Sequence, residues 1–205
     1  MFDRIALKIT KPAVDATARQ IVKYGINADQ VTFACFILGM TSAVLIMLGQ
    51  FQIALFPLLL GRICDGLDGA VARQTVQTDR GAFMDIALDF VFYASIPLAF
   101  AIAAPQLNAL PSAALLAAFV GTGTSFLAYA TLAEKRGEKS TDYPTKSFYY
   151  LGGLTEGTET ISTFTLMCLF PQHFTLLAYV YATLCTLTTA TRIIAGWQNF
   201  AATKR

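Results

Sequence analysis

Six apolar stretches, each close to the length of a membrane crossing, take up most of the sequence. A helix needs about 20 mostly apolar residues to cross the hydrocarbon core of a bilayer. Only 14% of the residues are charged, against about 25% in a typical soluble domain. The sequence therefore predicts an all-α integral membrane protein with six transmembrane helices, in a single domain over residues 1–205. The expected spans are 31–48, 51–71, 82–104, 112–133, 157–171 and 173–197.

The placement of Lys and Arg predicts how the chain is oriented. The connections 49–50, 104–111 and 171–172 contain neither residue, so all fifteen lie on the other side of the membrane or in helix ends that face it. Because cytoplasmic segments carry the excess of Lys and Arg, both termini and the longer segments 72–81 and 134–156 are expected in the cytoplasm. We therefore expect a multi-pass protein of a bacterial inner membrane. The formal net charge of +2 gives no electrostatic reason to expect a nucleic-acid partner.

The segment 1–25 precedes the spans and has a different pattern. Its apolar residues recur at near-helical spacing with basic residues between them, which is typical of a helix that lies in the membrane interface. The alternative is a solvated basic tail. We expect an interfacial amphipathic helix over 1–25, followed by a six-helix bundle over 31–197.

Two pairs of aspartates stand at the cytoplasmic ends of the second and third expected spans. Asp65 and Asp68 are three residues apart. Asp85 and Asp89 are four apart, so each pair lies on one face of its helix. The short link between the spans predicts that the two helices are antiparallel neighbours, which lets the pairs converge. Carboxylates that face one another repel strongly unless cations lie between them. Oxygen ligands without nearby His or paired Cys favour Mg²⁺ or Mn²⁺ over zinc.

Two other interpretations of these acids remain open. In the first, Arg62, Arg73 and Arg80 neutralise carboxylates at the edge of a loop. Against it, ionisable groups inside membrane spans are costly and usually functional. In the second, the chain is an ion-coupled membrane transporter whose acids form a cation pathway. Against that, the charged residues gather toward one membrane face.

The aspartates and several small residues form one motif. It reads Asp65-Gly66-Leu67-Asp68-Gly69-Ala70-Val71-Ala72-Arg73 and, after seven residues, Gly81-Ala82-Phe83-Met84-Asp85-Ile86-Ala87-Leu88-Asp89. This motif resembles the signature of the CDP-alcohol phosphotransferases, and every required position is filled. The resemblance implies six membrane helices after an interfacial helix. It also implies transfer of a phosphatidyl-type group from CDP-diacylglycerol to an alcohol, with release of CMP, in phospholipid biosynthesis.

The resemblance further implies roles for individual residues. Asp65, Asp68, Asp85 and Asp89 would bind two divalent ions, Mg²⁺ or Mn²⁺. Asp89 would also be the catalytic base that deprotonates the acceptor hydroxyl. A second family motif is matched around Thr32, although Ala28 stands where the family has proline. The residues expected to bind the CDP-lipid are Asp29, Thr32, Gly69, Ala72, Arg73 and Gly81.

The sequence leaves the acceptor alcohol open. Lys146 and Arg192 could bind the phosphate of inositol phosphate or glycerol phosphate. The simpler explanation is a basic cytoplasmic loop and an arginine that snorkels to the interface. Glu156 and Glu159 could instead bind the amine of serine or of another amino alcohol, or pair with one of the cations.

Small residues recur on the third and fourth expected spans. Such faces let membrane helices pack closely, and together with the resemblance they predict a homodimer. The residues are Ala94, Ser95, Ala99, Ala113, Ala114, Ala117, Ala118 and Gly121.

Overall fold

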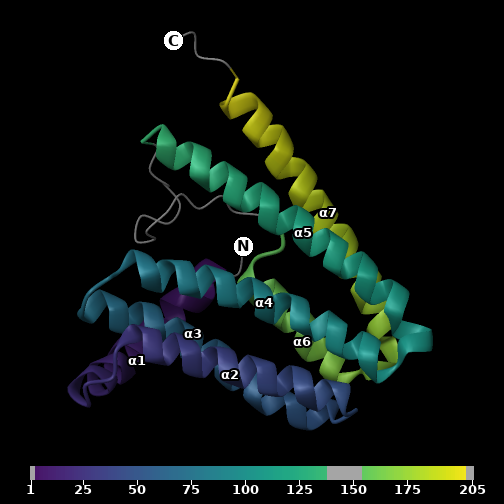
Figure 1. Ribbon diagram of the computed structural model, residues 1–205, viewed down its shortest axis with the longest axis horizontal. Helices are drawn as coiled ribbons and strands as arrows, with labels where there is room; N and C mark the ends of the chain where they lie inside the picture. Colours follow the sequence, from purple (N-terminus) through teal and green to yellow (C-terminus); the bar gives the residue numbers. More distant parts are fainter. Residues whose placement is uncertain (1–2, 138–153, 202–205) are drawn as a thin grey trace.

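The computed structural model of the chain describes residues 3–137 and 154–201, of which 3–10 only as backbone. Within that part every regular element is a helix, so the all-α prediction is confirmed (Figure 1). The elements are α1 (Asp3–Lys23), α2 (Ala28–Met47), α3 (Phe51–Gln74), α4 (Asp79–Ala103), α5 (Pro105–Lys135), α6 (Gly157–Leu169), the 3₁₀ turn η1 (Pro171–His173) and α7 (Phe174–Asn199).

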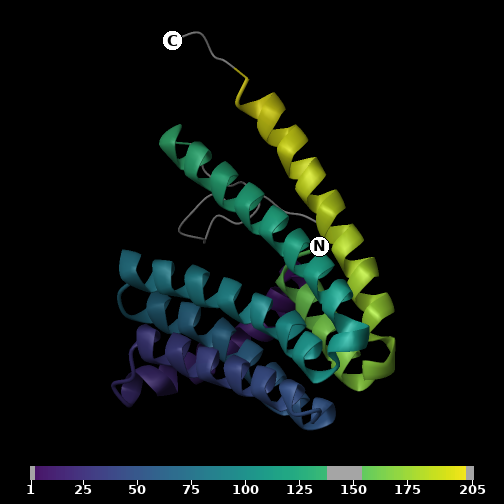
Figure 2. The ribbon, with the colours of Figure 1, turned by 45° about the vertical axis from the view of Figure 1, so that its right-hand side comes forward.

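The helices form two groups that meet at one end. Helix α2 packs against both α3 and α4, and α1 lies against α3. Helices α5 and α7 pack on each other and leave the first group at an angle, as both views show (Figures 1 and 2). The two groups come together around the α4–α5 connection and α6. Most of the aspartates lie toward the other end of the first group, where α3 ends and α4 begins.

The first turns of α2 and α4 are fixed by side-chain caps. Asn27 accepts a hydrogen bond from the backbone N–H of Gln30, and the Gln30 side chain accepts one from the N–H of Asn27. This reciprocal capping box satisfies donors that a helix start otherwise leaves unpaired. Thr78 likewise accepts from the N–H of Gly81 at the start of α4. The two caps lie next to Asp29 and Gly81, which are among the residues predicted to bind the CDP-lipid.

The main core fills the space where the two groups of helices meet. Its largest fully buried side chains include Phe100, Phe164 and Phe174. Two polar side chains tie α5 to the final turns of α4. Asn108 donates to the carbonyl oxygen of Phe100 at 3.0 Å, and Ser112 donates to that of Pro97 at 2.8 Å. A smaller core between α1, α2 and α3 holds the acid-bearing end of α3 in place.

Helix α5 begins earlier than the sequence suggested. The segment 104–111 was expected to be a loop, but Ala104 is its only residue outside a helix, and α5 starts at Pro105. Proline is well tolerated in the first turn of a helix because its missing N–H has no partner there anyway. The expectation of a loop was therefore wrong, and α5 runs for 31 residues.

Four helical segments are long and apolar enough to cross a membrane: α2, α4, α5 and η1 with α7. Their exposed side chains include many large apolar ones, such as Phe33 and Ile37 on α2, as lipid contact requires. Helix α3 has 24 residues but carries charges over its last turns. Helix α6 has 13 residues, or about 20 Å at 1.5 Å per residue. A count of six spans therefore stays a prediction.

The close approach of α2 to α4 depends on Gly39. A Cβ atom at this position would lie 2.6 Å from Cδ2 of the buried Phe92. We expect Gly39→Ala to lower the free energy of unfolding by about 1–3 kcal/mol through overpacking. Gly66→Ala is the matched control, because nothing lies within 4 Å of a Cβ atom there. Thermal unfolding in detergent should show a lower midpoint for Gly39→Ala alone, and equal midpoints for both variants would contradict the expectation.

Candidate active site

Three carboxylates meet between α3 and α4. Oxygen atoms of Asp65, Asp68 and Asp85 all lie within 4.8 Å of one another. Asp68 is buried, and the other two are half-buried. The short link predicted that α3 and α4 are antiparallel neighbours, but the two helices are not closely packed along their backbones. Helix α2 packs on both instead, and the acids face each other beside it.

Asp68 is held by two hydrogen bonds. The hydroxyl of Thr32 on α2 donates to its Oδ2 at 2.6 Å, and the backbone N–H of Gly69 donates to its Oδ1 at 2.5 Å. Hydrogen bonds to a charged acceptor are stronger than those between neutral groups. The orientation of this carboxylate is thus set by a residue that lies 36 positions away in the sequence.

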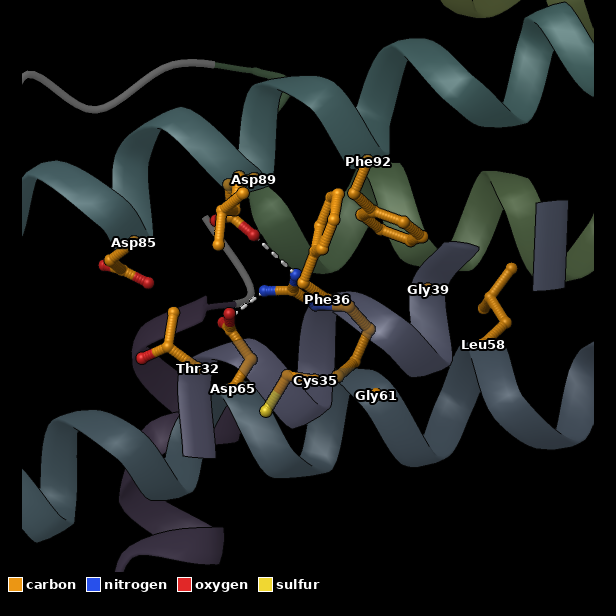
Figure 3. A pocket seen from close by; sticks show the side chains of 12 residues that line it. Thr32, Cys35, Phe36, Gly39, Leu58, Gly61, Asp65, Asp85, Asp89 and Phe92 are labelled. Carbon is orange, nitrogen blue, oxygen red and sulfur yellow. Dashed lines mark hydrogen bonds and ion pairs between the residues drawn. The ribbon is translucent and has the colours of Figure 1, made fainter. Parts of the chain in front are cut away.

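Asp89 lies outside the group of three and has a different partner. Arg62 donates from one guanidinium nitrogen to Asp89 Oδ1 at 2.9 Å and from the other to Asp65 Oδ2 (dashed lines in Figure 3). The guanidinium also lies 5.8 Å from the ring centroid of Phe92 and 5.7 Å from that of Tyr93. Arg62 therefore links the two helices that carry the acids.

A pocket opens beside these residues between α2, α3 and α4 (Figure 3). The volume of the pocket is about 330 Å³ when the part that is open to solvent is counted. Asp65, Asp85 and Asp89 stand toward one end, whereas Gly39 and Leu58 stand at the other. A pocket with one charged and one apolar end suits a ligand that is itself amphipathic.

The remaining residues predicted to bind a CDP-lipid lie around the ends of the same helices. Asp29 forms an ion pair with Arg80, which joins the first turn of α2 to that of α4. Gly81 lies beside it, since a Cβ atom there would be 3.2 Å from Asp29 Oδ1. Arg73 turns back along α3, and its Nη1 would lie 3.3 Å from a Cβ atom at Gly69. Ala72, next to Arg73, is half-buried.

A family model described as CDP-alcohol phosphatidyltransferase matches residues 26–194. The chain belongs to this family. The match covers α2 to α6 in full and most of α7, so it contains all the residues of the pocket.

Individual relatives agree with this assignment. The inner membrane protein YnjF of Escherichia coli (strain K12) is 47% identical over 205 residues, which is 100% of both chains. Together with the long apolar helices, this relative shows that the chain is a multi-pass membrane protein. The phosphatidylinositol phosphate synthase PgsA1 of Mycobacterium tuberculosis has the same fold. Its structure with CDP-DAG bound matches at a TM-score of 0.70 and 19% identity, over 90% of this chain and 93% of that one. Its structure with manganese and citrate matches at 0.70 and 20%, over 90% and 88%.

Among the described residues proposed for the acceptor, none lines the pocket beside the aspartates. Lys146 falls outside the described residues. Arg192 on α7 is only 7% exposed, and it donates to the carbonyl oxygen of Thr122 on α5 at 3.1 Å. A snorkelling side chain would be more exposed. Glu156 and Glu159 form a capping box at the start of α6, in which each side chain accepts from the other's backbone N–H.

Arg62 is the residue that sequence reasoning undervalued. It appeared there only as one of three cations near the acids, yet the structure places it between Asp65 and Asp89. Its position three residues before Asp65 could have indicated the first contact. The second contact, to a residue 27 positions away, depends on how α3 and α4 face each other.

Proposed function

We propose that this family member transfers a phosphatidyl-type group from CDP-diacylglycerol to an alcohol, releasing CMP in phospholipid biosynthesis. The observation that carries the proposal is the meeting of Asp65, Asp68 and Asp85 beside a pocket with an apolar far end, whose charged end is lined by the first and the last of them. A CDP-lipid has the matching chemistry, with a diphosphate beside long acyl chains. The site holds the diphosphate at the aspartates, while the acyl chains stay among apolar residues and lipid.

The donor set fits divalent ions of the Mg²⁺ or Mn²⁺ class. Three carboxylates with oxygens within 4.8 Å of one another offer the hard oxygen ligands that these ions prefer. We propose that Asp65, Asp68 and Asp85 hold one ion, and that Asp89 contributes to a second. Bound ions neutralise charge on the phosphates and help to orient the attacking hydroxyl.

Among the side chains of the site, Asp89 is proposed to accept the proton during the reaction. Arg62 engages its Oδ1, and Oδ2 is the atom on which we propose that the proton is accepted. The acceptor hydroxyl loses its proton to Oδ2 and forms a bond to the phosphorus that carries the diacylglycerol. The bond from this phosphorus to the CMP oxygen breaks, and CMP leaves with that electron pair. A positioned base of this kind contributes roughly 10²- to 10⁴-fold in rate.

The nucleotide part of the CDP-lipid is proposed to bind at the helix ends that surround the aspartates. Small residues leave space for the backbone to approach the cytidine, and Arg73 offers a planar group that can bind phosphate through two parallel hydrogen bonds. Asp29 and Thr32 define the other side, on the first turns of α2. The proposed set is Asp29, Thr32, Gly69, Ala72, Arg73 and Gly81.

The proposed acceptor site uses residues outside the group of aspartates. Arg192 is the strongest candidate, because a buried arginine within a membrane span is usually functional. With Lys146 it would favour a phosphorylated alcohol such as inositol phosphate or glycerol phosphate. Glu156 and Glu159 would favour an amino alcohol such as serine, but both already cap α6.

Release of CMP tests the proposal directly. Purified protein in detergent is incubated with CDP-diacylglycerol and Mn²⁺, and inositol phosphate, glycerol phosphate and serine are offered in turn. We expect CMP to appear with one acceptor and without any sealed compartment. Ion-coupled uptake into proteoliposomes, together with no CMP release from any CDP-lipid, would favour the transporter interpretation instead.

The aspartates are expected to lie on the cytoplasmic side of the membrane. We propose that both termini and the aspartates face the cytoplasm, because Lys and Arg concentrate on that side of the predicted spans. Helix α1 is proposed to lie along the same interface. Labelling of single cysteines placed at Glu134 and at Gln106 in spheroplasts tests this orientation, since only the second should react with an impermeant reagent.

Thr32 is expected to support metal binding through Asp68. Thr32→Val removes the hydroxyl that holds Oδ2, and loss of such a partner typically weakens metal affinity or activity by about 10- to 100-fold. Thr32→Ser should keep most of the affinity. Thr41→Val is the matched control, because Thr41 is exposed and its hydroxyl bonds to the carbonyl of Ile37 on its own helix. Mn²⁺ titration would contradict the expectation if both valine variants bound like wild type.

The chain is also expected to form a homodimer. Part of the small-residue face named above is used within one chain, since Ser95, Ala99 and Ala118 are buried there. Ala113 and Ala117 on α5 are exposed and remain available to a second copy. Light scattering corrected for detergent should give the mass of two chains, and a monomeric mass at several concentrations would count against the dimer.

A further inference from the structure

Arg62 is a cation built into the acid site. Its side chain is only 19% exposed, and it contacts carboxylates on two different helices. An arginine that only balanced charge at a loop edge would lie in solvent, as Arg80 does with a side chain 76% exposed. Arg62 instead lines the pocket together with Asp65, Asp85 and Asp89. It therefore competes for these carboxylates with any other cation in the site.

The charges around Arg62 limit how many divalent ions the site can accept before the donor binds. With all four aspartates ionised, the carboxylates carry four negative charges, and Arg62 carries one positive charge. One divalent ion brings this sum to one negative charge, and a second would make it positive. The diphosphate of a CDP-lipid supplies further negative charge. A second ion thus gains a favourable environment only when the donor lipid is bound.

We propose that Arg62 is a positioning residue that occupies Asp89 and part of Asp65 until the CDP-lipid binds, so that the second divalent ion enters with the donor. The inference rests on the proposed function. Arg62 contacts Asp89, which lies outside the group formed by Asp65, Asp68 and Asp85. Loss of Arg62 should therefore tighten ion binding in the absence of the lipid.

Mn²⁺ binding to metal-free protein tests this separately from activity. Electron paramagnetic resonance of free Mn²⁺ counts the ions bound by the full chain in detergent, with and without CDP-diacylglycerol. We expect wild type to bind one ion tightly without the lipid and two with it. Arg62→Gln should bind two without the lipid, with the affinity for the second raised by at least about tenfold. Arg62→Lys keeps the charge and should remain close to wild type.

Arg80→Gln is the matched control. It also removes an arginine that pairs with an aspartate, but that partner is Asp29, outside the group of three carboxylates. Its Mn²⁺ isotherm without the lipid should match that of wild type. A general loss of structure in Arg62→Gln would weaken ion binding instead of tightening it.

The outcomes separate the inference from the proposed function. If wild type binds no Mn²⁺ with or without CDP-diacylglycerol, the metal assignment in the proposed function fails. If wild type binds two ions equally well without the lipid, the role of Arg62 is overturned and the metal site stands. The role is overturned as well if Arg62→Gln binds no more Mn²⁺ than wild type does. The wild-type comparison decides the matter even if that variant does not fold.

Discussion

Asp89→Asn should lower the rate of transfer by several orders of magnitude while the CDP-lipid still binds. The substitution keeps the shape of the side chain and one oxygen, but the amide cannot accept the proton. Loss of base catalysis alone costs roughly 10²- to 10⁴-fold, and a disturbed contact with Arg62 adds to this loss. Single-turnover rates and equilibrium binding of CDP-diacylglycerol, both at saturating Mn²⁺, give the two quantities.

Two further variants make the comparison specific. Asp68→Asn should weaken Mn²⁺-dependent binding of the CDP-lipid itself, because Asp68 is one of the three grouped carboxylates. Asp79→Asn makes the same chemical change on α4 at an exposed residue in its first turn, so its transfer rate should stay near that of wild type. If Asp89→Asn transfers within a factor of a few of wild type, another group must accept the proton.

Removal of divalent ions should abolish CMP release. The three grouped carboxylates repel one another without a cation, and Arg62 can pair with only one of them. Protein stripped with EDTA and then freed of the chelator should show no release above background. Added Mn²⁺ should restore the rate, whereas EDTA already saturated with Mn²⁺ should have no effect. Release at the original rate by protein shown to be metal-free would refute the site assignment.

The part of the site that follows from local spacing could be predicted from the sequence. Intervals of three and four residues put each pair of aspartates on one helix face, and Asp65, Asp68 and Asp85 do meet. The packing around them could not be predicted in the same way. The short link suggested that α3 and α4 were direct neighbours, whereas α2 packs on both. Contacts across helices depend on rotation about each helix axis, which spacing alone does not determine.

Polar residues near the membrane edge were harder to interpret. The acids at the start of α6 suggested an amine-binding site, but the structure gives them a local task as a capping box. The signal was present, since an acid three residues after a cap position is a common pattern at helix starts. Arg192 was ambiguous for a different reason. Its burial between α5 and α7 depends on the packing of two helices that are far apart in the sequence.

The first turns of α2 contribute none of the grouped carboxylates and yet hold both sides of the site. Asn27 caps the helix, Asp29 binds Arg80 on α4, and Thr32 binds Asp68 on α3. A natural variant with a damaged α2 start could therefore keep every aspartate of the motif and still lose catalysis. Homologues that have become inactive should be recognised by changes at these three positions as well as by changes in the motif itself.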